Sequence, residues 1–348
     1  MIRLAVIGAG QWGPNLLRNF HNRERSEVAW VVDLDPVRLQ QVRRRFPGVS
    51  VTSDLSVAMA DARVDAIVVA TPTSTHYPLT RVALEAGKHV FVEKPVATSS
   101  REALELVAIA ERHRRVLMVG HVFLHNNGVA RVKQHLDAGD LGRVYYVSMV
   151  RTNLGPVRAD VNAAWDLAAH DISIVNHWLE AEPLSASAIG GAWIRPGIED
   201  AVFATLRYPN QVLVNLHVSW LNPRKARDIT VVGDRRMLTF DDMNLDEPVR
   251  IYDKRLEGSP EAPVFTDTFA TFRSSIREGS IIIPRVPLGE PLRTECEHFI
   301  DCIEQGRQPV ACGRTAARVV RALEAIAVSV RNHGREEPVS DGGYDGPD

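Results

Sequence analysis

Two short stretches of the sequence hold side chains that could do acid–base chemistry. In "FVEKPVATSS", the charged residues Glu93 and Lys94 come directly after the apolar run "KHVFV". In "WDLAAHD", Asp166 and His170 are four residues apart within a segment of helical periodicity, which places carboxylate and imidazole on one helical face. His170 could then accept a proton, and Asp166 could orient it or bind a substrate hydroxyl.

Each stretch also has a structural explanation. Lys94 could be a solvated lysine at the end of a strand, and Asp166 and His170 could be a helix cap and a core histidine. The neighbouring Pro95 and the presence of a second cluster favour chemistry for Lys94. For Asp166 and His170, the segment alone does not decide between the two explanations.

The elements that must position Lys94 lie in the first third of the chain. There, short β-branched runs alternate with amphipathic helical stretches up to about residue 120. This alternation predicts a parallel sheet covered on both faces, which is a doubly wound α/β fold. Ligands of such sheets bind beyond the carboxyl ends of the strands, where Glu93 and Lys94 are expected. Thr71, Pro72 and His76 in "ATPTSTH" follow another strand at the same edge.

The first predicted strand leads into a glycine-rich turn, "GAGQWG", that opens a helix. Gly8, Gly10 and Gly13 have the G-x-G-x-x-G spacing, and Gln11 and Trp12 lie inside the turn. In a dinucleotide site the glycines serve a tight turn, close approach of the backbone to the pyrophosphate, and close packing of helix on strand. All five residues are therefore predicted to border a cofactor.

An acidic residue, Asp33, ends the second predicted strand about twenty residues past the last glycine. A carboxylate there accepts hydrogen bonds from the ribose hydroxyls of the adenosine and repels a 2'-phosphate. The alternative is a glycine turn in an α/β protein that binds no dinucleotide, but strand, spacing and acid together argue against it. The sequence predicts NAD as the cofactor and disfavours NADP.

Length and composition predict about two domains and limit the classes of partner. The chain has 348 residues and a formal net charge of -2, so nothing recommends nucleic acid or a membrane surface as partner. No apolar segment suits a signal peptide or a membrane span, which predicts a cytoplasmic protein. The spacing of the three cysteines suits neither a disulfide framework nor a zinc site, and no metal is expected.

Beyond about residue 122, a helix is followed by runs that predict successive, mostly antiparallel strands. We therefore expect a dinucleotide-binding domain over 1–121, an α+β domain over 122–335 and a loose tail over 336–348. The segment from about 256 to 286 has weak periodicity and is too long for an ordinary turn. It suits a substrate lid or an arm to a neighbouring subunit, and its sequence does not decide which.

Together these motifs resemble the Gfo/Idh/MocA family, the glucose-fructose oxidoreductase and inositol dehydrogenase group. The resemblance covers nearly the whole chain and rests on "AVIGAGQWG", "VFVEKPVA" with the family's E-K-P signature, "DAGDLGRV", "WDLAAHD" and "CEHFIDCIEQGRQPV". It implies a Rossmann domain followed by a domain with a large open sheet that often mediates homodimers or homotetramers. It also implies nicotinamide-dependent oxidation or reduction at a carbinol carbon of a sugar or cyclitol.

The resemblance further implies roles for individual residues. Lys94 would bond the reacting oxygen near the nicotinamide and stabilise developing alkoxide charge. His170 would take the hydroxyl proton as hydride leaves the carbon, and Asp166 would hold a neighbouring hydroxyl or the imidazole. Pro95 would follow a cis peptide bond, and Glu93 would have a positional role.

The chain departs from the family pattern next to Asp166. Ala168 stands where the family usually has glycine, and Trp165 stands where other members carry small residues. These changes alter the wall of the substrate pocket but leave the spacing of Asp166 and His170 intact.

The substrate class is suggested by a finer resemblance. "WDLAAHD" and "SWLNPRKARDITVVGDRRMLTFDD" are most similar to members that oxidise nucleotide-activated amino sugars at C3. Guanidinium groups bind diphosphates well, so the cationic and amide residues nearby would suit a UDP-sugar, although surface charge explains them equally. These residues are Arg151, Asn153, Arg158, Arg224 and Lys225.

Other functions remain open at this point. The same site would serve a dehydrogenase of a free sugar or inositol, or a ketosugar reductase. A protein of another class, a regulator that senses NAD without catalysis, would keep the Rossmann domain, but intact Lys94, Asp166 and His170 argue against it.

Overall fold

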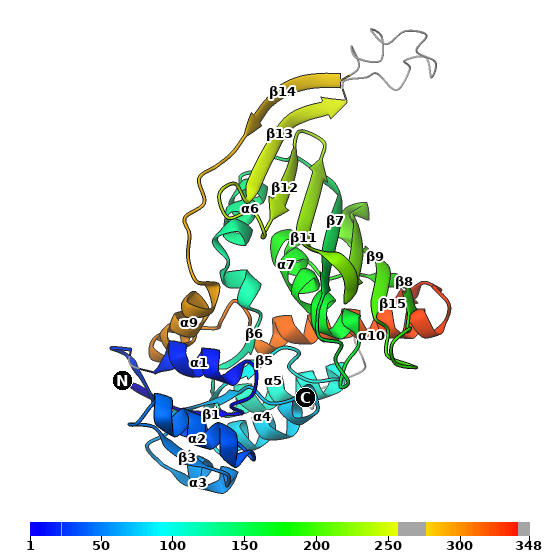
Figure 1. Ribbon diagram of the computed structural model, residues 1–348. Helices are drawn as coiled ribbons and strands as arrows, with labels where there is room; N and C mark the ends of the chain where they lie inside the picture. Colours follow the sequence, from blue (N-terminus) through cyan, green and yellow to red (C-terminus); the bar gives the residue numbers. More distant parts are fainter. Residues whose placement is uncertain (22, 257–275, 340–348) are drawn as a thin grey trace, which may run out of the picture.

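The structure is a computed structural model that describes residues 1–21, 23–256 and 276–339. It consists of two sheets, each with its own helices, one above the other in Figure 1. The expected lid or arm falls largely outside the described residues. Within them, no helix has both the length and the apolar character needed to cross a membrane.

The first domain is a parallel sheet with strand order β3-β2-β1-β4-β5-β6. β4 and β6 are buried along their whole length because helices cover both faces of the sheet, which confirms the predicted doubly wound Rossmann fold. The elements are β1 Ile2–Ile7, α1 Gly13–Phe20, β2 Ser26–Val32, α2 Pro36–Arg45, β3 Ser50–Thr52, α3 Leu55–Ala60, β4 Ala66–Val69, η1 Thr73–Thr75, α4 His76–Glu85, β5 His89–Glu93, α5 Ser100–Arg112 and β6 Leu117–Gly120.

The second domain is a mixed sheet with the order β14-β13-β12-β11-β7-β10-β9-β8-β15. β10 runs parallel to β7 and the other pairs are antiparallel, as predicted. The elements are η2 Val122–His125, α6 Asn127–Asp137, β7 Val144–Leu154, η3 Ala164–Ala168, α7 Ala169–Leu179, β8 Ser185–Gly191, β9 Ala201–Arg207, η4 Pro209–Gln211, β10 Leu213–Ser219, β11 Leu221–Gly233, β12 Met237–Asp241, β13 Val249–Leu256, β14 Ile276–Ile282, α9 Pro291–Gln305, α10 Gly313–Arg331 and β15 Glu337–Pro338.

The end of the chain ties the two domains together (Figure 1). After β14 the chain returns to the Rossmann sheet, where Leu292 and Phe299 of α9 share a core with Phe20. Helix α10 contributes Val320 to a core of the first domain and Leu323 to that of the second. This packing differs from the expected division at residue 121, because the apolar faces of both helices match surfaces of the first sheet.

The last described residues are not loose. Glu337 and Pro338 of β15 pair with Ala186 and Ser185 of β8, which adds an edge strand to the second sheet. The expected loose tail from residue 336 is therefore wrong for 336–339, where backbone pairing supplies order that a polar sequence does not indicate. The rest of that tail lies outside the described residues.

Candidate active site

The glycine turn after β1 has the close contacts that a dinucleotide cradle requires. Gly8 has a φ of 95°, and a Cβ there would lie 2.6 Å from the carbonyl oxygen of Ala70. A Cβ on Gly13 would lie 1.9 Å from the carbonyl oxygen of Gly8. Only glycine fits at either position, which brings α1 tightly against the sheet. Gln11 and Trp12 are exposed within the turn, and Gly10 borders Arg38.

Asp33 lies directly beneath this turn at the end of β2. Its Oδ2 accepts a hydrogen bond from the Ala9 N–H at 2.7 Å, and its Oδ1 accepts one from the Asp35 N–H at 2.8 Å. The Arg38 guanidinium is 3.6 Å from the same carboxylate. Asp33 therefore braces the glycine turn, and its contact with a ribose hydroxyl stays a prediction.

The β4 edge shows a different role for one expected cofactor residue. His76 is 1% exposed, and its two ring nitrogens are hydrogen-bonded to the carbonyl oxygens of Pro95 and Thr71. The expectation that His76 contacts the cofactor is corrected, because both nitrogens join the loop after β4 to the loop after β5. Thr71 is partly exposed and Pro72 is exposed, so both remain available at the sheet edge.

Lys94 and Asp166, from different domains, meet in the structure. The Lys94 ammonium donates to the Asp166 carbonyl oxygen at 2.7 Å and to its Oδ1 at 3.0 Å. The expected cis peptide bond is present between Lys94 and Pro95. Arg158 also donates to Asp166 Oδ1 at 3.2 Å, and the indole of Trp220 donates to Oδ2 at 3.2 Å.

The charge of Asp166 is held in place by these neighbours. Burial raises the pKa of the carboxyl, but the ammonium of Lys94, the guanidinium of Arg158 and the Trp220 N–H act more strongly in the other direction. Its pKa is therefore lowered from the usual value, and the carboxylate stays ionised at neutral pH. A fixed anion beside Lys94 orients the ammonium without a substrate.

His170 follows Asp166 by one widened turn. Residues Ala164–Ala168 form a π-helical turn before α7, so Asp166 and His170 are not stacked as in a regular helix. Among the hydrogen bonds of the described residues, none joins their side chains, and the Nδ1 atom of His170 is buried without a partner. The ring of Phe123 packs edge-on against the imidazole, with centroids 4.9 Å apart.

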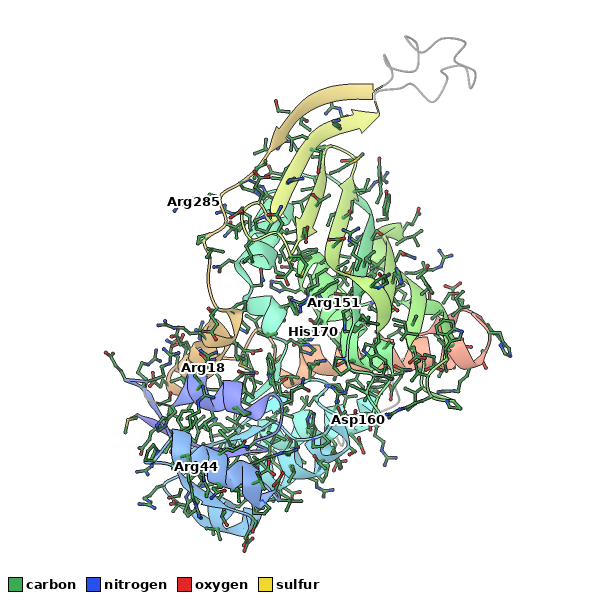
Figure 2. All side chains as sticks on the ribbon, in the orientation of Figure 1. Arg18, Arg44, Arg151, Asp160, His170 and Arg285 are labelled. Atoms are coloured by element: carbon green, nitrogen blue, oxygen red, sulfur yellow. The ribbon has the colours of Figure 1, made fainter. Side chains whose placement is uncertain are left out.

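The surroundings of His170 keep its imidazole neutral. Burial lowers the pKa well below its usual value, and the positive charges of Lys94, Arg151 and Arg227 lower it further. A neutral imidazole at physiological pH is a proton acceptor. Figure 2 shows His170 between the two sheets, close to Arg151.

Arg151 is not available to bind a substrate diphosphate. Its guanidinium is buried, pairs with the buried carboxylate of Asp171 at 2.7 Å and stacks on the ring of Phe123, 4.3 Å from its centroid. The expectation that Arg151 contacts substrate is corrected, because a residue that looked free in the sequence has a buried partner on α7. Asn153, two residues on, is partly exposed.

We expect Arg151→Ala to destabilise the fold by about 3–5 kcal/mol, because it leaves the Asp171 carboxylate buried without its partner. Urea unfolding followed by circular dichroism measures the change. Arg224→Ala is the matched control, since Arg224 is an exposed arginine paired with Asp228 at the surface. Equal unfolding midpoints for the two variants would contradict the structural role of Arg151.

Several residues of the site escaped sequence analysis. Trp220 is 1% exposed and lies 54 positions after Asp166, and no local pattern marks it as a partner of that carboxylate. Phe123, in the short helix η2, forms one wall beside His170. Arg158 was a candidate for a diphosphate, and the structure brings it to Asp166 instead. Lys225 is exposed.

Comparison with known proteins identifies the family to which the chain is similar. Residues 2–121 match the GFO_IDH_MocA family, described as "Oxidoreductase family, NAD-binding Rossmann fold", and residues 129–239 match the "GFO/IDH/MocA C-terminal domain". The chain is similar to UDP-N-acetylglucosamine 3-dehydrogenase of Acidithiobacillus ferrooxidans, with 28% identity over 94% of this chain and 97% of the relative. It is also similar to inositol 2-dehydrogenase 2 of Saccharopolyspora erythraea, with 30% identity over 79% of this chain and 82% of the relative.

A solved structure shows the same arrangement of domains. UDP-N-acetylglucosamine 3-dehydrogenase GnnA from Acidithiobacillus ferrooxidans superposes with a TM-score of 0.79 at 25% identity. The match covers 95% of this chain and 98% of that one.

Proposed function

Because the chain belongs to the Gfo/Idh/MocA oxidoreductase family, we propose that it moves hydride between a sugar carbinol carbon and the nicotinamide of NAD. The observation that supports this most is the contact of Lys94 with Asp166 across the two domains, one widened turn before the neutral His170. A lysine cation can stabilise the developing alkoxide charge, and a neutral imidazole can accept the hydroxyl proton.

The residues of the cofactor site fit NAD. The glycine turn leaves its backbone open to a pyrophosphate, and Asp33 stands where a ribose hydroxyl would donate. When bound, NAD accepts the hydride. The roles that remain fall to side chains of this chain, and each follows from its surroundings.

Three side chains have separate roles toward the substrate: Lys94, His170 and Asp166. The Lys94 ammonium binds the reacting oxygen and stabilises the negative charge that develops there. The buried, neutral His170 accepts the hydroxyl proton as the carbon–hydrogen bond breaks. Asp166 holds the Lys94 ammonium and presents an acceptor to a neighbouring hydroxyl. In the reverse direction, the same groups return the proton to a ketosugar.

We propose a nucleotide-linked amino sugar as the substrate, oxidised at C3. The support is the similarity to UDP-N-acetylglucosamine 3-dehydrogenase over nearly the full length of both chains. The second candidate is a cyclitol, supported by the similarity to inositol 2-dehydrogenase 2. Asn153 is partly exposed and stays a candidate substrate ligand, whereas the guanidinium of Arg151 is held in a buried ion pair.

A substrate panel tests this proposal. Purified protein with NAD is offered UDP-sugars, free hexoses, inositols and 3-ketosugars, and the absorbance of reduced nicotinamide is followed. We expect NADH to form with a UDP-N-acetyl sugar and not with Lys94→Ala. NADH formed with inositol alone would replace the nucleotide sugar by the second candidate. An equal signal in the Lys94→Ala variant would contradict the site itself.

Cofactor choice gives a separate prediction. We expect Asp33→Ala to lower the preference for NAD over NADP by about ten- to a hundredfold, since a charge-assisted hydrogen bond is lost and the repulsion of a 2'-phosphate disappears. Arg38, released from Asp33, would then face the phosphate. The ratio of kcat/KM for the two cofactors measures this change. The Asp33→Ala/Arg38→Ala double variant should not gain NADP, and an unchanged ratio in the single variant would show that the carboxylate acts only on the glycine turn.

We propose that the protein is a cytoplasmic homo-oligomer that pairs through the outer face of the second sheet. Phe203 on β9 is 47% exposed there and stacks on His217 of β10, with Ile189 and Tyr146 exposed on neighbouring strands. Phe203→Glu should therefore shift the mass measured by light scattering from an oligomer to a monomer. A wild-type protein that is already monomeric would contradict this proposal.

A further inference from the structure

The protein holds a buried carboxyl group, that of Glu295, which has no role in the proposed hydride transfer. Glu295 belongs to α9 and is 0% exposed, on the face that packs against the Rossmann sheet. Neither carboxyl oxygen has a hydrogen-bond partner among the described residues. Because an unpaired carboxylate is costly to bury, burial raises the pKa of Glu295 well above its usual value and holds the group as a neutral acid.

The packing of β5 and α9 brings Glu295 to Glu93. Phe91 and Glu93 are two residues apart on β5, so they lie on the same face of the sheet. The ring of Phe91 packs against that of Phe299 on α9, with centroids 5.7 Å apart. Glu295 is four residues before Phe299, one helical turn away on the same side. Two residues along β5 from Phe91 is Glu93, and one turn along α9 from Phe299 is Glu295, so the two carboxyl groups lie close together. Besides burial, the charge of Glu93 raises the pKa of Glu295.

A glycine makes room for the Glu93 side chain. Gly120 of β6 pairs with Glu93 across the sheet, and a Cβ on Gly120 would lie 3.0 Å from Glu93 Oε2. The other carboxyl oxygen, Oε1, is buried and has no hydrogen-bond partner in the described part of the chain. The Glu93 carboxyl therefore lies against the β6 backbone, and Glu93 directly precedes Lys94 in the chain.

Within the described ranges, other charged and polar groups lie around this pair of carboxyl groups. The charge of Lys94 and a hydrogen bond from the side chain of Trp12, in the glycine turn, both lower the pKa of Glu93. On α9, the neighbouring group is the buried thiol of Cys296. Burial raises the pKa of this thiol, the charge of Arg23 lowers it, and the charge of Glu290 raises it.

Only one of the two carboxyl groups can ionise near neutral pH. Burial raises the pKa of Glu93 to about 7, while Lys94 and Trp12 act in the opposite direction. Because Glu295 stays protonated, the pair holds two protons below about pH 7 and one above it, and Glu93 carries the change in charge.

We infer that Glu295 is a positioning residue that holds Glu93 as a proton-dependent charge at the nicotinamide end of the cofactor site, so that pH sets the relative affinity for NAD and NADH. The inference rests on the proposed function for the place of the nicotinamide beside Lys94. An oxidised nicotinamide ring carries a positive charge and a reduced ring is neutral. An anionic Glu93 attracts the oxidised form, so NAD is favoured above about pH 7 and NADH gains below it.

Cofactor binding without any sugar tests this inference. Calorimetric titrations with NAD and with NADH, from about pH 5.5 to about pH 8.5, give the ratio of the two Kd values. For the wild-type protein we expect the preference for NAD to rise about tenfold through this range. In Glu93→Gln the ratio should no longer depend on pH. In Glu295→Leu an apolar side chain replaces the neutral acid beside Glu93, which disfavours the Glu93 anion, so the midpoint should rise by about one pH unit.

The matched control is Glu297→Leu, which changes an exposed glutamate of the same helix that pairs with Arg293. It should leave the midpoint where the wild type has it. A ratio that does not change with pH in the wild type, a pH dependence that persists in Glu93→Gln, or equal midpoints for the Glu295 and Glu297 variants would each overturn the inference. Since no sugar is present, failure of the proposed sugar oxidation in the panel leaves this test intact, and the two ideas fail separately.

Discussion

We expect Lys94→Ala to lower kcat by about two to three orders of magnitude while Kd for NADH changes little. The ammonium is placed by Asp166 from the other domain, so its loss removes the donor for the developing oxyanion but no part of the glycine turn. Asp166 keeps its contacts with Arg158 and Trp220, so the local structure should survive. Steady-state kinetics with the substrate found in the panel, and fluorescence titration with NADH, measure the two effects.

Two further variants sharpen the result for Lys94. Lys94→Arg keeps a positive charge but changes its geometry, so partial activity would separate charge from position. Lys133→Ala removes a lysine that pairs with Asp137 and Glu180 away from the site, and kcat should not change. If Lys94→Ala weakened NADH binding as much as turnover, Lys94 would hold the nicotinamide rather than the reacting oxygen.

His170→Asn should lower kcat/KM by about two to four orders of magnitude, because the proton acceptor is lost. The dependence of kcat/KM on pH tests this role. Burial and nearby positive charges lower the pKa of His170 well below its usual value, so the imidazole is neutral at pH 7 and above. In the wild type, protonation of His170 should therefore lower kcat/KM as pH decreases through that lowered pKa, and this acidic limb should be missing in His170→Asn.

Matched variants distinguish the pH dependence caused by His170 from that caused by other ionisable groups. A limb near pH 7 that disappears in Glu93→Gln belongs to Glu93, whose pKa is raised to about 7 by burial. His177→Asn changes another histidine of α7 and should keep both the rate and the acidic limb. An acidic limb that persists unchanged in His170→Asn would show that His170 is not the proton acceptor.

The sequence by itself predicted the framework of the site. The period-two and helical runs, the spacing of Gly8, Gly10 and Gly13, and the place of Asp33 are local patterns. Each depends on backbone geometry over a few residues, so each can be identified without knowledge of distant contacts. The same holds for Lys94 at the end of β5, since the carboxyl edge of a parallel sheet follows from its topology.

Only the tertiary structure decided which polar groups meet. Lys94 and Asp166 are 72 residues apart, and docking of the second domain on the first brings them together. The sequence suggested Arg151 as a phosphate ligand, but in the structure its guanidinium pairs with the buried carboxylate of Asp171 on α7. Glu295 lies on a helix that returns to the first sheet from the far end of the chain, where no local pattern connects it to Glu93.

The physical reason is the range of the interactions concerned. Hydrophobic periodicity and turn geometry act between neighbours in the chain, so the sequence determined the elements and the sheet edge at which the candidate residues lie. The charge state of a side chain depends on its burial and on the charges packed around it. For His170 and Glu93 those surroundings come from both domains and from α9, so the tertiary structure alone made one a neutral base and the other an acid that titrates near pH 7.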